Sequence, residues 1–152
     1  MKNQNSYEYH QPTLFSTFPD LDSICVDGAC RGNPGPVEYR GVRTDTGQEL
    51  FRHGPFRGGT NNAGEFLALV HGLAYLKQTG LALPVYSDSL VAIRWVKAGE
   101  CRAKLDPGDH NAGLRDLIDR AERWLRDNEI ENDICHWNTR EWGNIPADFQ
   151  RK

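Results

Sequence analysis

The chain has 152 residues, which suits a single domain whose core needs no disulfide or structural metal. Hydrophobic residues make up 38% and charged residues 26%, values typical of globular proteins, and no apolar run is long enough to span a membrane. The net charge of -3 argues against indiscriminate binding of polyanions, so a nucleic-acid partner would need a local patch and metal ions.

The four cysteines show neither a C-x-x-C pair nor a Cys/His cluster, which favours reduced thiols and a cytoplasmic location over disulfides or zinc. The polar start of the chain is not a signal peptide. Residues 1–20 carry scattered aromatic residues and two prolines without any period. We therefore expect a flexible N-terminal arm over residues 1–20 and one folded domain over residues 21–152.

An apolar stretch, Ile24–Val26, leads to an acid, Asp27, and then to a loop rich in glycine and proline that reaches Pro36. This pattern predicts a buried strand over about residues 21–27, with Asp27 at its end, followed by a tight loop. An ordinary strand with an Asp-Gly turn explains the same pattern equally well.

The following segments alternate between strand and helix patterns. Residues 37–44 and 48–54 predict a hairpin, and residues 61–79 predict a helix that begins after Thr60 and ends at Gly80. The remaining elements are a strand at 83–87, helices at 90–98 and about 111–128, a strand at 133–137, and a turn into a short terminal helix at 145–149. Because a strand–helix–strand unit implies parallel pairing, we expect an α/β domain with a mixed sheet covered by helices.

Four acids lie at the edges of these elements, namely Asp27, Glu65, Asp88 and Asp148. Glu65 is expected in the first helical turn, on the apolar side, and Asp88 directly after a strand, where it would serve equally well as a helix N-cap. Ligands of open α/β sheets bind beyond the carboxyl ends of strands. If the four carboxylates converge, their repulsion favours Mg²⁺, and two ions about 4 Å apart suit an in-line phosphoryl displacement.

Four motifs, in this order along the chain, resemble type 1 ribonuclease H. They are Asp27-Gly28-Ala29-Cys30 with Gly32–Pro36, Thr60-Asn61-Asn62 with Glu65, Ser87-Asp88-Ser89, and Ile145-Pro146-Ala147-Asp148-Phe149. The resemblance covers about Leu21 to the C-terminus. It implies a ribonuclease H-like fold with a mixed five-stranded sheet in the order 3-2-1-4-5, flanked by helices.

The resemblance also implies a magnesium-dependent endonuclease that hydrolyses the RNA strand of RNA/DNA hybrids and leaves 5′-phosphate and 3′-hydroxyl ends. Two Mg²⁺ ions are implied, with Mn²⁺ as the alternative metal. Asp27 would bridge both ions, Glu65 and Asp88 would hold the ion beside the leaving oxygen, and Asp148 would share with Asp27 the ion that activates water. We expect a monomer that needs neither a membrane nor a protein partner.

Five further residues match family positions that contact the minor groove and backbones of the hybrid, namely Cys30, Asn33, Asn61, Asn62 and Ser89. Short polar groups and close-lying backbone suit recognition of the 2′-hydroxyl that distinguishes RNA. Asn33 is also explained as a turn residue, and Asn61 or Asn62 as a helix cap, and these roles are compatible with recognition.

The chain departs from the family pattern near its C-terminus. The loop before Asp148 lacks the histidine that many members carry, and Asn144 stands where members with the same ending carry glutamate. Glu141 is the nearest candidate for this auxiliary role. The basic protrusion of some members is reduced here to Lys97, Arg102 and Lys104.

Three other functions stay open at this stage. A catalytically weak hybrid-binding module is disfavoured because all four acids are present. A magnesium phosphatase for small substrates is disfavoured because no Asp-x-Asp motif follows the first strand. Another ribonuclease H-like nuclease, one that cuts DNA junctions, is disfavoured by the loop Cys30–Asn33 and the pair Asn61-Asn62.

Overall fold

The computed structural model describes residues 18–149, so almost all of the expected arm over residues 1–20 lies outside the described residues. The strands are β1 (Ile24–Cys30), β2 (Gly35–Arg43), β3 (Glu49–Gly59), β4 (Val85–Ser87) and β5 (Ile134–His136). The helices are α1 (Asn61–Thr79), α2 (Leu90–Ala98), α3 (Ala112–Asp127) and α4 (Thr139–Trp142), and a 3₁₀ turn over Asp109–Asn111 precedes α3.

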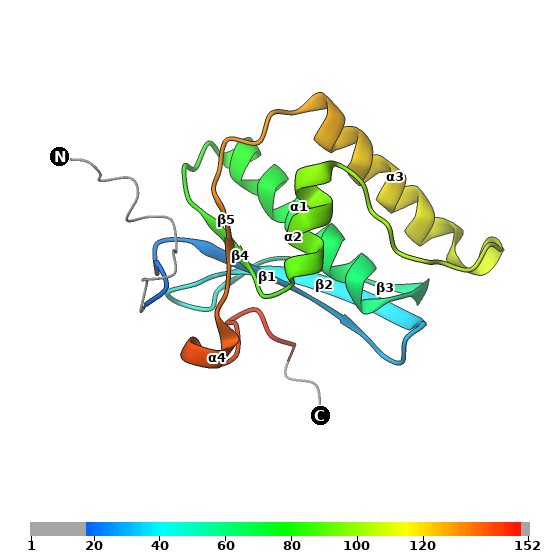
Figure 1. Cartoon of the computed structure of the whole chain (residues 1–152), viewed down its shortest axis with the longest axis horizontal. Helices are drawn as coiled ribbons and strands as arrows, with labels where there is room; N and C mark the ends of the chain where they lie inside the picture. The colour runs from blue at the N-terminus through cyan, green and yellow to red at the C-terminus, as the bar shows by residue number, and fades with distance from the viewer. Residues whose placement is uncertain (1–17, 150–152) are drawn as a thin grey trace.

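The five strands form one mixed sheet in the order β3-β2-β1-β4-β5. β1, β2 and β3 pair antiparallel, whereas β4 is parallel to both β1 and β5. This topology confirms the predicted α/β fold and its strand order (Figure 1).

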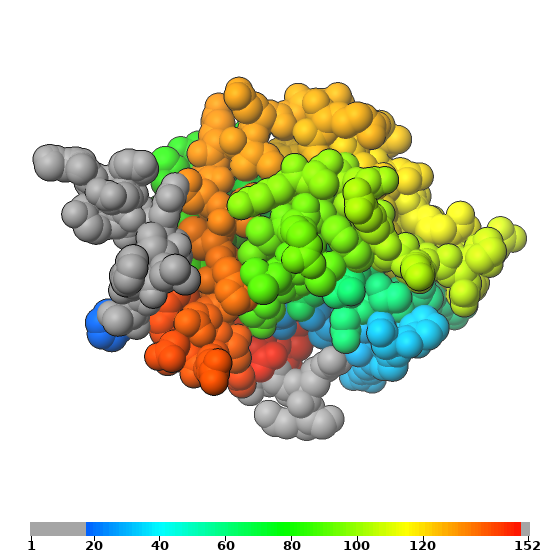
Figure 2. Space-filling view, viewed as in Figure 1, coloured from blue at the N-terminus to red at the C-terminus, as the bar shows by residue number. Residues whose placement is uncertain are grey.

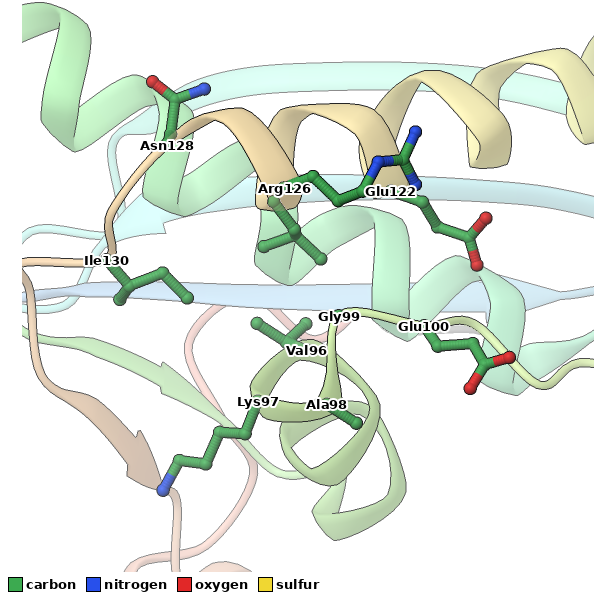
Figure 3. A pocket seen from close by; sticks show the side chains of 10 residues that line it. Val96, Lys97, Ala98, Gly99, Glu100, Glu122, Arg126, Asn128 and Ile130 are labelled. Carbon is green, nitrogen blue, oxygen red and sulfur yellow. The ribbon is translucent and has the colours of Figure 1, made fainter.

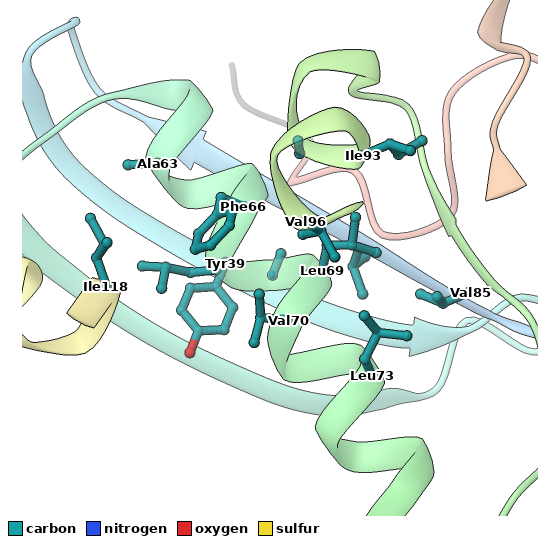
Figure 4. Close-up of a cluster of buried hydrophobic side chains, with 14 of the residues drawn as sticks. Tyr39, Ala63, Phe66, Leu69, Val70, Leu73, Val85, Ile93, Val96 and Ile118 are labelled. Carbon is teal, nitrogen blue, oxygen red and sulfur yellow. The ribbon is translucent and has the colours of Figure 1, made fainter. Parts of the chain in front are cut away.

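The two faces of the sheet are covered unequally. Helices α1, α2 and α3 lie on one face, while α4 and the C-terminal segment lie on the other (Figure 1). The larger apolar cluster lies under the three long helices and includes Phe66, Leu69 and Leu73 of α1 (Figure 4). The smaller cluster comprises Cys25, Val42, Tyr86, Cys135, Trp137, Ile145 and Ala147.

Side chains alternate along β1 between these two clusters. Ile24 and Val26 belong to the larger cluster and Cys25 to the smaller one. Because successive side chains in a strand point to opposite faces, Asp27 lies on the face of Cys25, which the C-terminal segment covers. The fold therefore brings Asp27 to the same side of the sheet as the segment that carries Asp148.

Three predicted boundaries are wrong. The strand predicted over residues 48–54 does not end at Gly54 but continues as β3 to Gly59, because Phe56 and Gly59 still pair with β2. β1 does not end at Asp27 but continues to Cys30, because Gly28, Ala29 and Cys30 still pair with β2. Residues 145–149 form a turn without the terminal helix expected there, and the short helix of this region, α4, lies earlier.

Helix ends follow the sequence signals closely. The Thr60 side chain accepts a hydrogen bond from the Ala63 N–H at 3.2 Å, and Gly80 ends α1 in the left-handed conformation with φ of 70°.

Within residues 18–149, none of the helices combines the length and apolar character that crossing a bilayer requires.

Candidate active site

Three of the four predicted acids meet at one end of the sheet. Asp27, Glu65 and Asp88 each offer a carboxylate oxygen, and these oxygens all lie within 4.8 Å of one another. Asp27 comes from the interior of β1, Glu65 from α1, and Asp88 directly follows β4, the parallel neighbour of β1. The predicted convergence is therefore confirmed for these three side chains.

Glu65 is held beside Asp27 by the backbone of β1. The Gly28 N–H donates a hydrogen bond to Glu65 Oε1 at 3.1 Å. A Cβ on Gly28 would lie only 2.7 Å from the Glu65 backbone nitrogen, so a glycine is needed where the strand meets the helix. Because α1 begins at Asn61, Glu65 lies just beyond the first turn in which it was expected.

Asp88 does not cap the helix that follows it. The cap of α2 is Ser89, whose Oγ accepts a hydrogen bond from the Ala92 N–H at 3.0 Å. The Ser89 N–H in turn donates to Ser87 Oγ at 3.1 Å. The alternative interpretation of Asp88 as an N-cap is therefore wrong, and its carboxylate is available to the acidic cluster.

Asp148 lies close to the other three acids but is not one of the group within 4.8 Å. Its negative charge raises the pKa of both Asp27 and Asp88, which places it within electrostatic reach of both. The Asp148 N–H donates to the Ile145 carbonyl at 2.9 Å and closes the turn that brings this residue back toward the sheet.

Burial and mutual repulsion raise the pKa values of the clustered carboxyls. Burial, followed by the charge of Asp88, raises the pKa of Asp27 to about 7. Burial and the charge of Asp27 raise the pKa of Glu65 well above its usual range, and burial is also the main cause of the raised pKa of Asp88. The cluster thus retains protons near neutral pH, and a divalent cation would displace them.

The donor set fits a hard cation. The candidate ligands are carboxylate oxygens, which Mg²⁺ and Mn²⁺ prefer to nitrogen or sulfur ligands. Asp27 is 6% exposed, whereas Glu65 and Asp88 are half-buried, so the cluster opens to solvent on one side. An ion held there would be accessible to a substrate.

A hollow of about 700 Å³ lies elsewhere, between the C-terminal end of α2 and α3 (Figure 3). Its lining mixes positive charges from Lys97 and Arg126 with negative charges from Glu100 and Glu122. It includes none of the four predicted acids. The acidic cluster, and not this hollow, is therefore the candidate active site.

Curated relatives identify the family. Ribonuclease H of Legionella pneumophila (strain Corby) is 32% identical over 133 residues, which cover 83% of this chain and 88% of that protein. This chain belongs to the ribonuclease H family. Ribonuclease H of Polynucleobacter asymbioticus is 31% identical over 122 residues, covering 75% of this chain and 74% of that protein. A scan of protein-family models found no match.

Among solved structures, the chain is similar to ribonuclease H1 of Halobacterium salinarum, with 27% identity and a TM-score of 0.46 over 76% of this chain and 83% of that one. It is also similar to LC11-RNase H1 in complex with an RNA/DNA hybrid, with 25% identity and a TM-score of 0.49 over 78% and 86% of the two chains.

The residues that match substrate contacts of ribonuclease H differ in accessibility. Asn33, Asn61 and Asn62 are exposed, and Asn33 Oδ1 accepts a hydrogen bond from the Asn61 N–H at 3.1 Å. Thr60 is the cap of α1, so the alternative interpretation of Asn61 or Asn62 as the cap is wrong. The amide side chains of Asn61 and Asn62 therefore remain candidates for contact with a duplex.

Cys30 and Ser89 already have structural roles. The buried Cys30 thiol donates to the Gly59 carbonyl at 3.4 Å, and the Ser89 hydroxyl caps α2. A contact with a ribonuclease H substrate at these two positions would therefore come mainly from the backbone or from a shared hydrogen bond.

The candidate auxiliary residues lie in and after α4. Glu141 and Asn144 are both exposed, and the Glu141 N–H donates to Asn138 Oδ1 at 3.1 Å, which fixes the start of α4. His136 was not predicted as a site residue, yet it pairs with Ser87 across the sheet, and its charge lowers the otherwise raised pKa of Asp88.

Sequence reasoning also missed Arg40, which binds the C-terminal segment through two hydrogen bonds to main-chain carbonyls. A single arginine in a predicted strand gives no local signal of a contact more than a hundred residues away. The alternation of side chains along a strand could only have indicated its face of the sheet.

Proposed function

We propose that this chain is a divalent-metal-dependent endonuclease that hydrolyses the RNA strand of RNA/DNA hybrids, with 5′-phosphate and 3′-hydroxyl ends as products. The observation that carries the proposal is the group of three carboxylates within 4.8 Å in a chain of the ribonuclease H family. The position of Asp148, within electrostatic reach of two of them, supports a fourth ligand.

In this proposal Asp27, Glu65 and Asp88 hold one Mg²⁺ ion, and Asp27 and Asp148 hold a second. Mn²⁺ is the alternative metal. When bound, such ions supply a nucleophilic water and neutralise charge on the leaving oxygen. The protein supplies the arrangement of ligands, because Asp27 lies in a paired strand and Glu65 is fixed by the Gly28 N–H.

Selection of RNA would depend on short polar groups beside the acidic cluster. Asn61 and Asn62 occupy the first positions of α1, and Glu65 lies one turn further along the same helix. A side chain amide both donates and accepts, as does a 2′-hydroxyl, so these residues suit recognition of the ribose. Asn33 would support them through its bond to the Asn61 N–H.

We also propose that the protein acts as a monomer in the cytoplasm. Its cysteines all lie within residues 18–149, where they form no disulfide, and burial raises the pKa of Cys25 and Cys135 to about 12. Such thiols suit a reducing compartment.

The deciding experiment offers the purified chain four labelled substrates, namely an RNA/DNA hybrid, double-stranded RNA, duplex DNA and a DNA junction. Each is incubated with Mg²⁺, with Mn²⁺ and with a chelator, and Asp27→Asn serves as the inactive control. We expect cleavage of the RNA strand of the hybrid alone, and only with metal. The fragments should be substrates for ligation at the 5′ end and for enzymatic extension at the 3′ end.

Two results would contradict the proposal. Binding of the hybrid without any cleavage would indicate a binding module, and cleavage of the junction in preference to the hybrid would indicate a different nuclease of the wider superfamily.

A further inference from the structure

Arg40 lies directly beside Asp27 in the sheet. The two residues are opposite each other on β2 and β1, and Arg52 of β3 is opposite Arg40 on its other side. Directly opposed residues of neighbouring strands present their side chains on the same face. Asp27, Arg40 and Arg52 therefore form one row across the face that the C-terminal segment covers.

The guanidinium of Arg40 binds the main chain on both sides of the Asp148 Cα atom. Its Nε–H donates to the Ala147 carbonyl at 2.7 Å, and its second terminal nitrogen donates to the Asp148 carbonyl at 2.7 Å. These carbonyls belong to the two peptide groups that flank Asp148. Because each peptide group is planar, fixing both groups fixes the φ and ψ angles of Asp148.

Neighbouring groups hold the guanidinium in this position. It lies 5.2 Å from the ring centroid of Phe149, and Glu49 binds it at 3.3 Å. The Arg40 side chain is only 20% exposed, so its hydrogen bonds are partly shielded from water. A planar guanidinium presents its donors in a fixed fork, which matches two neighbouring carbonyls better than a lysine ammonium would.

The C-terminal segment has little regular structure to hold it otherwise. Residues 143–149 belong to no helix or strand, and Figure 2 shows the segment, in red, at the surface beside α4. Ile145 and Ala147 are buried in the smaller cluster, and the Asp148 N–H bonds within its own turn. Burial anchors this segment to the sheet, but burial alone does not orient the Asp148 carboxylate.

We propose that Arg40 is a positioning residue that sets the Asp148 carboxylate relative to Asp27 by clamping both peptide groups around Asp148. This inference rests on the proposed function for its consequence in catalysis. Its structural part, the ordering of the main chain at Asp148, is independent of any activity.

The test compares Arg40→Gln and Arg40→Lys with the matched control Arg52→Gln. Arg52 lies on the same face, 5.0 Å from the centroid of the same Phe149 ring, but the hydrogen bonds to the Ala147 and Asp148 carbonyls come from Arg40. Replacing Arg52 therefore removes the same charge without removing these two bonds. Hydrogen exchange of the Asp148 amide, measured by NMR, reports the order of the turn without reference to activity. Exchange at Leu69, in the larger cluster, checks that the fold is intact.

We expect Arg40→Gln to accelerate exchange at Asp148 at least about tenfold while Leu69 is unchanged, and Arg52→Gln to change neither. Because misplacing a reacting group by about 1 Å can cost ~10²-fold in rate, kcat should fall by roughly 10- to 100-fold in Arg40→Gln. The KM for the hybrid should stay within about threefold, and more Mg²⁺ should be needed for half-maximal rate. Arg40→Lys keeps the charge but not the fork, so it should recover little of the loss.

A double-mutant cycle separates positioning from general structure. If Arg40 acts through Asp148, then Arg40→Gln should add little to the kcat loss already caused by Asp148→Asn, so the two effects should be strongly non-additive. Independent, additive losses would overturn the proposal. So would unchanged exchange at Asp148 in Arg40→Gln, equal losses in Arg40→Gln and Arg52→Gln, or a rise in KM with kcat intact.

Failure of the proposed function gives a different result. If the parental chain cleaves no hybrid under any metal condition, the proposed function fails, while the exchange comparison at Asp148 still supports or overturns the clamp.

Discussion

A Cβ on Gly28 would lie 2.5 Å from the carbonyl carbon of Gly64, so β1 and α1 meet there through bare backbone. Gly64 in turn faces Val37 of β2, whose Cγ2 would lie 2.6 Å from a Cβ at that position. This close approach brings the backbone that carries Glu65 near enough for the Gly28 N–H to bind its carboxylate. The separation of Asp27 and Glu65, two of the proposed metal ligands, thus depends on the absence of a side chain at Gly28.

We therefore predict that Gly28→Ala pushes α1 away from β1, lowers stability by about 1–3 kcal/mol and reduces cleavage of the hybrid at least ~10²-fold. Urea unfolding and steady-state kinetics measure the two effects. Gly113→Ala is the matched control, because a Cβ there meets nothing within 4 Å and Gly113 lies in helix α3, where alanine is favoured. Normal activity of Gly28→Ala would show that the close approach is not needed.

The acidic cluster predicts an unusual pH dependence of stability in the metal-free protein. The folded protein binds a proton at Asp27 up to about pH 7, whereas the ordinary pKa of this carboxyl is 3.8. The folded state therefore holds more protons between these pH values, so Asp27 makes stability fall as pH rises from about 4 to above 7. At 1.36 kcal/mol per pKa unit, the effect is on the order of a few kcal/mol.

Asp27→Asn should abolish cleavage and remove the part of this decline that Asp27 causes, whereas Glu65 and Asp88, whose pKa values are also raised, should retain a decline of their own. With a chelator present, the variant should therefore become increasingly more stable than the parent as pH rises. Added Mg²⁺ should restore the stability of the parent at high pH and leave the stability of the variant nearly unchanged. Melting temperatures from pH 4 to 8 test this. His71 has the opposite influence, because burial lowers its pKa to about 4, but it acts equally in both proteins. The control variant is Asp119→Asn, at an exposed position, and its melting temperature should equal that of the parent at every pH.

The basic residues Lys97, Arg102 and Lys104 are predicted to contribute to duplex affinity. All three are exposed, although Arg102 also pairs with Glu100 at 3.2 Å. Replacing all three with alanine should raise KM more than it changes kcat. The slope of log affinity against log salt should fall by about 0.9 for each phosphate that the variant no longer binds.

Lys77→Ala is the control for this prediction, because Lys77 lies in the last turn of α1, at the opposite end of the helix from Asn61 and Asn62. If KM is unchanged in the triple variant, or if KM rises equally in Lys77→Ala, the duplex is bound elsewhere.

Asn144 and Glu141 are predicted to determine how fast the product leaves. Asn144 is neutral and cannot take up a proton, so Asn144→Glu should raise kcat and shift the Mg²⁺ optimum. Glu141→Ala should have the smaller effect. Steady-state rates across a Mg²⁺ titration, alongside single-turnover rates, distinguish product release from chemistry. A large loss in Glu141→Ala without a gain in Asn144→Glu would assign the auxiliary role to Glu141.

Local signals predicted much of the fold. Thr60 and Gly80 mark the ends of α1 because capping depends on residues within one turn, and α2 has the predicted bounds. Glu65 and Asp88 were placed correctly near the site because each follows a strong local boundary. The convergence of all four acids, however, had to be taken from the resemblance to a family, since no local pattern relates residues so far apart.

The features that the sequence did not predict depend on partners distant in the chain. β1 continues past Asp27 because β2 supplies hydrogen-bonding partners, which the glycine-rich composition does not indicate. The clamp at Arg40 depends on a segment 107 and 108 residues away. Helix α4 spans only Thr139–Trp142, too short to show an apolar period.

The unequal covering of the sheet divides the proposed metal ligands between two parts of the domain that differ in how much apolar surface they bury. Glu65 belongs to the helix at the centre of the larger cluster, whereas Asp148 follows a segment anchored by Ile145 and Ala147 in the smaller one. Regions that bury little apolar surface open at lower free energy than the whole domain. Warming should therefore release the C-terminal segment first and silence the enzyme reversibly at a temperature at which the rest of the domain is still folded.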